Sequence, residues 1–375
     1  MLFNVCALYI KIMNNENQTI HKSDDNLTIY GWNEKLNQLK QESIYSTLAH
    51  GRVSIVHRTC YEVISGNGLF QCELTGNMMY GKSDDELPCT GDWVIFQPFD
   101  EHKGIIVDSL PRERTLYRKK SGTVADKQAI ASYVDKAFIV QSLDDNFNVR
   151  RVERFMVQIM EENISSVLVL NKADLDFDRQ SVEEQIKHIS SQIPVFFTSI
   201  HQLETIVRLR KSISEGETVV FVGSSGVGKS SLVNALCEKP VLLTSDISLS
   251  TGKGRHTSTR REMVLMDSSG VLIDTPGVRE FGLAIDNPDS LAEVLEISDY
   301  AESCRFKDCK HINEPGCAVL EAANSGVLDY KVYESYLKLR WEAWHFSASE
   351  HEKRKKEKSF TKFVEEVKNR KDANR

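Results

Sequence analysis

The segment at residues 223–230 constrains this chain most, because it matches the phosphate-binding loop pattern G-x-x-x-x-G-K-[ST] at every specified position. An apolar, β-branched run precedes it and a helical pattern follows it, which is the context this loop needs. The glycines let backbone N–H groups turn toward a phosphate, and the helix N-terminus adds a favourable dipole. Lys229 is expected to reach the β- and γ-phosphates and to act in catalysis, and Ser230 to ligate Mg²⁺. The predicted contacts are Gly223, Ser224, Ser225, Gly226, Val227, Gly228, Lys229, Ser230 and Ser231.

Composition and charge limit the class of protein. The net charge of −7 over 375 residues argues against a molecule that is basic overall, so any nucleic-acid contact must be local. The 8 cysteines are partly scattered and partly clustered, which fits a reducing cytosol better than a secreted disulfide framework. No apolar run reaches the roughly 18–20 residues of a membrane span. Residues 1–12 lack the basic leader of a signal peptide, and Met13 is an alternative start. We expect a cytoplasmic monomer without membrane contact.

Residues 49–118 carry a strand pattern with a period of two, interrupted by glycine and asparagine turn signals. Five short strands in about 70 residues favour a small closed barrel of the OB-fold type. Barrels of this kind bind RNA or oligosaccharides, but the pattern fits a purely structural barrel equally well. The predicted strands lie at 52–57, 60–64, 69–74, 92–96 and 104–108.

Two segments flank this predicted barrel. Residues 1–48 form an amino-terminal arm that we expect to be partly ordered, with a helical pattern at 32–39. Residues 112–120 are strongly basic and include a tyrosine. This composition allows either contact with nucleic-acid phosphates or a solvated charged face.

Residues 119–285 alternate between apolar strand patterns and amphipathic helix patterns. Such alternation predicts a mainly parallel sheet with helices on both faces, in which the phosphate-binding loop follows one strand. Helices are expected at 151–162, 182–192 and 204–213.

The tetrapeptide Asn171-Lys172-Ala173-Asp174 ends one of these strands and matches the guanine-specificity pattern N-K-x-D. A carboxylate at Asp174 can accept hydrogen bonds from the ring N–H and the exocyclic amine of guanine, whereas adenine lacks this donor pair and is rejected. Asn171 is expected to brace the loop, and Lys172 to lie over the base or the ribose. Thr198 and Ser199 end the next strand, where they are expected to support the base.

The segments after the phosphate-binding loop contain candidates for magnesium binding and catalysis. Residues 252–260 are rich in glycine, hydroxyl and basic residues, and Thr257 or Thr259 could complete the Mg²⁺ coordination. Asp274 is expected to hold Mg²⁺, and the N–H of Gly277 to contact the γ-phosphate.

The residue after Gly277 departs from Ras-like GTPases, in which a glutamine orients the attacking water. Val278 occupies that position here, which predicts slow intrinsic hydrolysis or the use of another group. His256 is the nearest catalytic candidate; the alternative is a histidine that only caps or packs the loop.

A cluster of Cys304, Cys309, His311 and Cys317 follows, with three thiols and an imidazole within a short segment. These ligands match a closed tetrahedral Cys₃His zinc site, which is typical of a structural metal. Residues 286–375 are therefore predicted to form a helical zinc-binding domain. Its basic tail at 353–358 reads either as an RNA-contacting helix or as a solvated one.

The order of these motifs is circularly permuted, because the guanine motif precedes the phosphate-binding loop. The order, the motifs Gly254-Arg255-His256-Thr257 and Asp274-Thr275-Pro276-Gly277, and the Cys₃His cluster together closely resemble the ribosome small subunit-dependent GTPase RsgA (YjeQ) family. The resemblance covers about residues 50–345. One departure is Ser132-Tyr133-Val134-Asp135, where the family usually has a small residue followed by Asn-Val/Ile-Asp.

The resemblance implies an OB domain, a permuted α/β P-loop GTPase domain and a carboxy-terminal zinc domain with one structural zinc ion. It also implies a factor that acts late in assembly of the small ribosomal subunit, binds GTP and GDP with Mg²⁺, and is stimulated by that subunit. In the family the OB and zinc domains contact ribosomal RNA. Two alternatives remain: a nucleotide-gated RNA-binding module whose hydrolysis is incidental, and a GTPase that acts on another complex.

Overall fold

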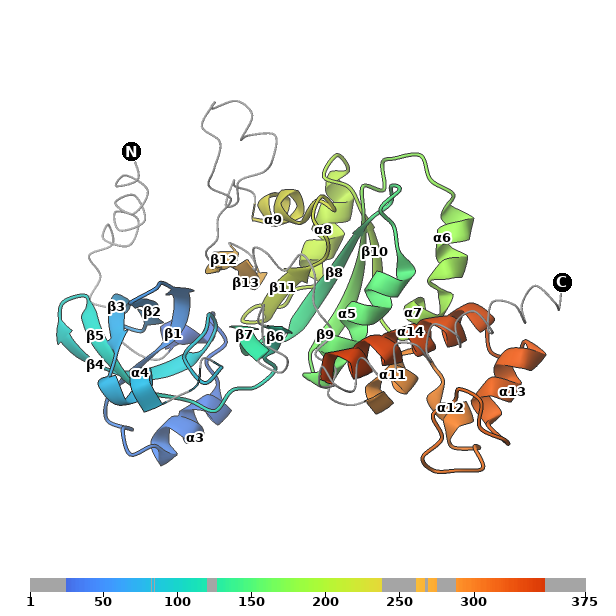
Figure 1. Ribbon diagram of the computed structural model, residues 1–375. Helices are drawn as coiled ribbons and strands as arrows, with labels where there is room; N and C mark the ends of the chain where they lie inside the picture. Colours follow the sequence, from blue (N-terminus) through green and yellow to red (C-terminus); the bar gives the residue numbers. More distant parts are fainter. Residues whose placement is uncertain are drawn as a thin grey trace.

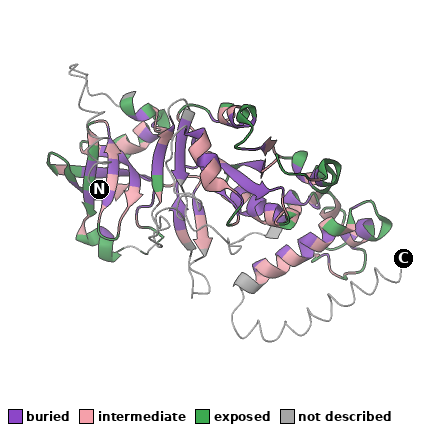
Figure 2. Ribbon diagram, turned by 90° about the horizontal axis from the view of Figure 1, so that it is seen from above, coloured by how far each residue is buried: buried purple, intermediate pink, exposed green. Residues whose placement is uncertain are grey.

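The computed structural model describes residues 25–81, 83, 85–119, 127–237, 261–266, 269–274 and 288–347 (Figure 1). A barrel lies at one end of the molecule, a sheet flanked by helices occupies the middle, and a helical region lies at the other end. Buried residues run along the strands of the barrel and of the central sheet (Figure 2). Within the described ranges, no helix has the length and apolar character needed to cross a membrane.

The amino-terminal strands close into the predicted barrel. Strand β1 pairs with β2 on one side and with β4 on the other, and β3 pairs in parallel with β5, so no edge is left open. Inward-facing residues alternate along the strands, as Phe70 and Cys72 do on β3, and they fill the barrel interior with Val63 and Phe96. Helix α4 (Gly76–Gly81) links β3 to β4. The barrel strands are β1 (Ala49–Val56), β2 (Tyr61–Ser65), β3 (Gly68–Leu74), β4 (Trp93–Asp100) and β5 (Lys103–Ser109).

The amino-terminal arm is packed where the structure describes it. Helix α2 (Asp25–Thr28) precedes helix α3 (Glu34–Glu42), which Asn33 caps by accepting a hydrogen bond from the Leu36 N–H. The Trp32 ring lies 4.8 Å from the Trp93 ring of the barrel, and both indoles are buried. Residues 25–48 therefore cover one side of the barrel. The rest of the predicted arm, residues 1–24, lies outside the described residues.

The central sheet continues from the barrel, because β1 pairs with β12 at Ile55 and Glu262. The strand order is β10-β9-β8-β11-β13-β12; all neighbours are parallel except β12, which runs antiparallel to β13. The bounds are β8 (Lys136–Ser142), β9 (Ser165–Asn171), β10 (Val195–Thr198), β11 (Thr218–Val222), β12 (Glu262–Met266) and β13 (Ser269–Asp274).

Helices cover both faces of this sheet, as the alternation predicted. On β8, Phe138 packs toward α8 and α9, while Ile139 packs toward α5, so successive residues serve opposite cores. The predicted helix at 182–192 is divided, because α6 ends at Gln185 and α7 begins at Lys187. The helices are α5 (Val149–Glu161), α6 (Arg179–Gln185), α7 (Lys187–Ser190), α8 (Leu203–Lys211) and α9 (Lys229–Leu236).

Three arginines of the basic run after the barrel make contacts within the fold. Arg112 pairs with the fully buried Asp92, with its Nη2 atom 2.7 Å from the Asp92 Oδ2 atom. Arg114 pairs with Asp135 at 3.0 Å, and Arg118 donates to Gln128. Each of these arginines therefore has a partner within the fold, and of these partners only Asp92 is buried. The two alternatives for residues 112–120, contact with nucleic-acid phosphates or a solvated charged face, stay predictions. The hairpin β6 (Leu116–Lys119) and β7 (Lys127–Ala131) links the barrel to β8.

The carboxy-terminal helices share one hydrophobic core with the sheet. Val319 and Tyr333 belong to the same buried cluster as Ile139 and Phe155. Two ion pairs add to this contact, from Arg150 to Glu334 at 3.0 Å and from Arg154 to Glu342 at 2.7 Å. The helices are α11 (Pro288–Val294), α12 (Ser298–Ala301), α13 (Ala318–Ser325) and α14 (Tyr330–Ser347). The basic tail at 353–358 lies outside the described residues.

The buried Arg52 side chain joins the barrel to the sheet. Its guanidinium donates to the Gly91 carbonyl at 2.9 Å and to the Thr218 hydroxyl of β11 at 2.8 Å, and also to the Tyr30 carbonyl. Burial lowers the pKa of Arg52 to about 10, so the group remains charged at neutral pH. Tyr133, which departs from the family pattern, lies beside it with a positive φ of 52° and donates its hydroxyl proton to the Pro111 carbonyl.

Candidate nucleotide site and metal centre

The predicted nucleotide-binding motifs meet at one edge of the central sheet. Because β8, β9, β10, β11 and β13 are parallel, their carboxyl ends lie on the same side. Asn171 ends β9, opposite Thr198 of β10 and Ser142 of β8, and Gly223 follows the last residue of β11. The parallel topology thus assembles a site from segments that are far apart in the sequence.

The phosphate-binding loop has the backbone that its glycines predict. Gly223, Gly226 and Gly228 have φ values of 149°, 83° and 93°, which residues with a Cβ rarely adopt. Gly228 directly precedes α9, so the loop leads into a helix N-terminus. The Lys229 ammonium donates to the carbonyls of Gly223 and Ser224, at 2.7 Å each, and so bends back over the loop.

A buried hydrogen bond joins the guanine motif to the phosphate-binding loop. The Asn171 Nδ2 atom donates to the Val227 carbonyl at 2.8 Å, and its Oδ1 atom accepts from the Thr198 hydroxyl at 3.3 Å. Asn171, Thr198 and Val227 are all buried. The contact also explains why position 228 requires glycine, since an added Cβ would lie 2.3 Å from Asn171 Nδ2. The predicted bracing role of Asn171 therefore has a direct geometric counterpart.

Asp174 is held as an exposed carboxylate beside the end of β10. The Ser199 hydroxyl donates to its Oδ1 atom at 2.5 Å, and this hydrogen bond lowers the pKa of Asp174 below its usual value. The Ala173 N–H donates to the Thr198 carbonyl, which ties the motif loop to β10. A charged acceptor is therefore available at neutral pH for a pair of N–H donors on a ligand.

Two supporting residues were not identified from the sequence. Thr205 on α8 accepts a hydrogen bond from the Ser199 N–H and donates to the Ser199 carbonyl, which fixes the loop after β10. Asp144 accepts from the Lys172 ammonium at 2.7 Å. The acidic pair at 144–145 directly after a strand was the available signal, but it has no motif of its own.

The magnesium and catalytic candidates are only partly described. The backbone of Asp274 ends β13, which is parallel to β11, so the residue belongs to the same sheet edge as the phosphate-binding loop. His256, Thr257, Thr259, Gly277 and Val278 lie outside the described residues.

The predicted metal ligands converge in the carboxy-terminal region. The Sγ atoms of Cys304 and Cys317 each lie 3.5 Å from His311 Nδ1 and 3.9 Å from one another, and all four ligand atoms, including that of Cys309, are within 4.8 Å. Tetrahedral zinc with Zn–S near 2.3 Å and Zn–N near 2.0 Å requires separations of about 3.5–3.8 Å. The donor set fits such an ion, and the ligand atoms of Cys304, His311 and Cys317 lie close to this spacing.

The surrounding backbone holds this cluster in place. His311 has a positive φ of 57°, and its carbonyl accepts a hydrogen bond from the buried Tyr333 hydroxyl of α14 at 2.8 Å. Cys317 begins α13 as its N-cap residue. Two of the ligands are thus tied to helices that pack against the central sheet.

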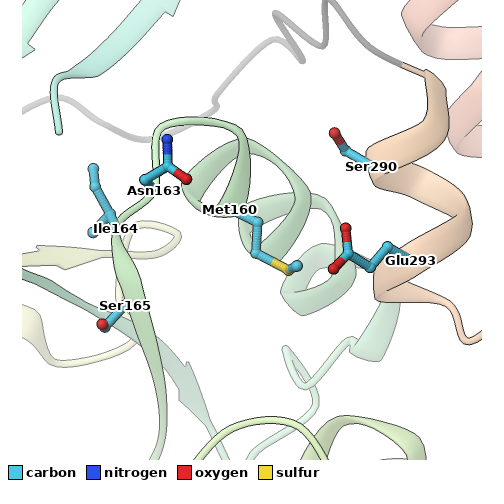
Figure 3. Close-up of a pocket in the computed structure, with 6 residues that line it drawn as sticks. All are labelled: Met160, Asn163, Ile164, Ser165, Ser290 and Glu293. Atoms are coloured by element: carbon cyan, nitrogen blue, oxygen red, sulfur yellow. The ribbon is translucent and has the colours of Figure 1, made fainter.

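A separate pocket of 330 Å³ lies between the end of α5, the start of β9 and α11 (Figure 3). Its lining includes Asn163 and Ser165 on one side and Ser290 and Glu293 on the other. Ser165 begins β9, whereas Asn171 ends it, so this pocket lies at the edge of the sheet opposite the candidate nucleotide site.

Two family models match parts of the chain. One, described as RsgA GTPase, matches residues 109–284. The other, described as ABC transporter, matches residues 206–370, a range that includes the phosphate-binding loop common to many nucleotide-binding proteins. Because both ranges include this loop, the two families are distinguished by similarity along the rest of the chain.

Such matches favour the first family. A protein from Bacteroides thetaiotaomicron named small ribosomal subunit biogenesis GTPase RsgA 1 is 76% identical over 359 residues, which covers 96% of this chain and 99% of that protein. A protein from Methanosarcina acetivorans named small ribosomal subunit biogenesis GTPase RsgA is 38% identical over 338 residues, covering 87% of this chain and 89% of that protein.

Solved structures agree on the fold. The crystal structure of YjeQ from Thermotoga maritima has a TM-score of 0.59 and 26% identity, and covers 79% of this chain and 98% of that chain. The structure of YloQ, described as a circularly permuted GTPase, also has a TM-score of 0.59, with 22% identity over 80% of this chain and 97% of that chain. Because the identity to full-length relatives is this high and the permuted fold matches, this chain belongs to the RsgA family of GTPases.

Proposed function

We propose that this GTPase acts in maturation of the small ribosomal subunit and that binding to the subunit stimulates its hydrolysis of GTP. The names of the relatives support the biological process. The observation that carries the biochemical part is the hydrogen bond from Asn171 to Val227, because it joins a guanine-reading motif to a phosphate-binding loop in one site.

In this proposal the nucleotide lies along the carboxyl edge of the sheet. Asp174 accepts the two guanine donors, supported by Ser199, while Lys172 lies against the base. Residues 223–231 surround the phosphates, and Lys229 leaves its loop carbonyls to neutralise charge on the β- and γ-phosphates. Ser230, Thr257 and Asp274 would hold Mg²⁺, and the Gly277 N–H would contact the γ-phosphate.

Hydrolysis is proposed to be slow until the partner binds. Val278 replaces the water-orienting glutamine, so the free protein lacks one group that Ras-like GTPases use. His256 is our candidate for the group that acts on the attacking water in the subunit-bound state.

The Cys₃His cluster is proposed to hold one structural zinc ion through Cys304, Cys309, His311 and Cys317. The closed donor set leaves no position for a substrate, so the ion stabilises local structure and takes no part in hydrolysis. Residues 286–375 would thus form a zinc domain next to the GTPase domain at 119–285. The zinc domain and the OB domain at 49–118 would contact ribosomal RNA. The protein would act in the cytoplasm as a monomer.

The test is GTP turnover by the purified protein with and without purified small subunits. We expect weak intrinsic turnover that rises by at least about tenfold with subunits, as GTPases awaiting a partner do. Lys229→Ala should abolish both rates, because it removes the charge partner of the γ-phosphate. Absence of stimulation would refute the assembly-factor proposal, and near-normal turnover by Lys229→Ala would refute the phosphate-loop assignment.

Two alternative functions predict other outcomes. A nucleotide-gated RNA-binding module would sediment with the subunit in a GTP-dependent manner without stimulated turnover. A GTPase that acts on another complex would stay out of the subunit fraction even with a non-hydrolysable GTP analogue.

A further inference from the structure

The carboxylate of Asp144 lies just beyond the end of β8, beside the guanine motif. Its Oδ2 atom accepts from the Lys172 ammonium at 2.7 Å. Its Oδ1 atom accepts from the Ser142 hydroxyl at 2.6 Å and from the Asn146 N–H at 3.0 Å. One oxygen therefore stabilises the local turn, and the other holds the motif lysine.

Both partners are fixed before any nucleotide arrives. Burial alone would raise the pKa of Asp144, but the hydrogen bonds from Lys172, Ser142 and Asn146 lower it to about 2, so the carboxylate is charged at neutral pH. Lys172 has a left-handed backbone with φ of 62°. The Leu143 N–H donates to the Asn171 carbonyl, which joins the two loops directly.

This ion pair contributes little to the fold by itself. The side chains of Lys172 and Asp144 are 35% and 31% exposed, and pairs of this exposure contribute weakly to stability. Any larger effect of this ion pair therefore acts on ligand binding through the Lys172 side chain. A lysine side chain has many rotamers, and a contact that restricts them beforehand reduces the entropy lost on ligand binding.

We propose that Asp144 is a positioning residue for nucleotide binding. By accepting a hydrogen bond from the Lys172 ammonium, it holds the methylene groups of Lys172 where they will pack against the guanine base when the nucleotide binds. This inference rests on the proposed nucleotide site. It assigns a role to a residue outside the guanine motif and the phosphate-binding loop.

Asp144→Asn tests this role with little other change. The amide keeps an oxygen for Ser142 and Asn146, but its NH₂ group cannot accept from Lys172. Asp145→Asn is the matched control, because it makes the same charge change one residue away at an exposed position. The measurements are titrations with fluorescent GDP, GTP and IDP, and thermal unfolding without nucleotide.

We expect Asp144→Asn to raise the Kd for all three nucleotides by a common factor of roughly threefold to tenfold, the effect of ordering one long side chain. The factor should be the same for IDP, which lacks the 2-amino group, because Asp174 and not Lys172 reads that group. The Kd of Asp145→Asn should stay within about twofold of the wild type, and the loss should shrink at high salt.

A double-mutant cycle separates positioning from a direct effect. If Asp144 acts through Lys172, Asp144→Asn should change the Kd little further in a Lys172→Met background. An unchanged Kd in Asp144→Asn, an equal loss in Asp145→Asn, or additive losses in the cycle would overturn the proposal. A fall in Tm above about 5 °C would also overturn it by placing Asp144 in the fold. If wild-type protein binds no guanine nucleotide, the proposed function itself fails; if it does and Asp144→Asn binds equally well, only the positioning role fails.

Discussion

Replacing Asn171 by alanine should weaken nucleotide binding, because its side chain is the buried link between the two halves of the site. The substitution removes the 2.8 Å hydrogen bond to the Val227 carbonyl and the 3.3 Å bond from Thr198. Val227 is fully buried, so water cannot readily replace the lost donor. An orphaned buried acceptor costs about 1–3 kcal/mol.

The unpaired Val227 carbonyl belongs to the loop that surrounds the phosphates. If the loop moves so that water can reach this carbonyl, nucleotide binding must restore the original geometry. The full cost of about 1–3 kcal/mol then appears in the free energy of binding. Since 1.4 kcal/mol corresponds to a factor of ten, the Kd for GDP should rise roughly fivefold to hundredfold. Titration with a fluorescent GDP measures this directly, and urea unfolding of the same variant shows how much of the loss is stability.

Thr198→Val is the matched control, since it removes only the longer bond and keeps the side-chain shape. We expect less than about a threefold change in the Kd for this variant. The reasoning is refuted if Asn171→Ala binds GDP within about twofold of the wild type while the protein stays folded. It is equally refuted if Thr198→Val loses as much affinity as Asn171→Ala, because the contact to the phosphate loop would then not be the cause.

Three further predictions concern the base, the metal and the joint between barrel and sheet. Asp174→Asn should shift preference from guanine toward xanthine, which presents an acceptor where guanine has its amine; an unchanged preference for GTP over XTP in competition assays would count against base reading. Removing zinc with a chelator should increase proteolysis around residues 300–320 while the Kd for GDP changes less than about threefold. Arg52→Met should lower the free energy of unfolding by about 2–4 kcal/mol in urea titrations, since it removes the buried hydrogen bonds to the Gly91 carbonyl and the Thr218 hydroxyl.

The sequence predicted those features that depend on local pattern. The barrel strands alternate with a period of two, and the parallel sheet follows from alternating strand and helix patterns, so both were confirmed. The guanine motif and the phosphate-binding loop were placed together because both follow strands of one parallel sheet. The Cys₃His cluster was found from ligand spacing alone.

Features that depend on distant partners could not be predicted in this way. Arg52 bonds to Thr218, 166 positions further along the chain, and nothing near Arg52 in the sequence indicates that partner. The partner of Arg112 could not be predicted for the same reason: a sequence shows that Arg112 is charged, but only the fold brings it to the buried Asp92. Asp144 was missed because its function depends on a lysine in the next strand's loop.

The permuted order has a physical consequence for β11, the strand that leads into the phosphate-binding loop. At its amino end, Thr218 is bonded to Arg52 of the barrel and to the Asp135 carboxylate. At its carboxyl end, the loop is bonded to Asn171 through Val227. All five residues of β11 are buried. The strand therefore has no freedom to shift without breaking buried hydrogen bonds at one end or the other. Besides the pairing of β1 with β12, this short, tightly held strand gives the barrel a direct connection to the loop. Arg52→Met is therefore a test of communication as well as of stability. Its Kd for GDP should change even though Arg52 lies at the opposite end of β11 from the loop, and an unchanged Kd in the folded variant would refute this connection.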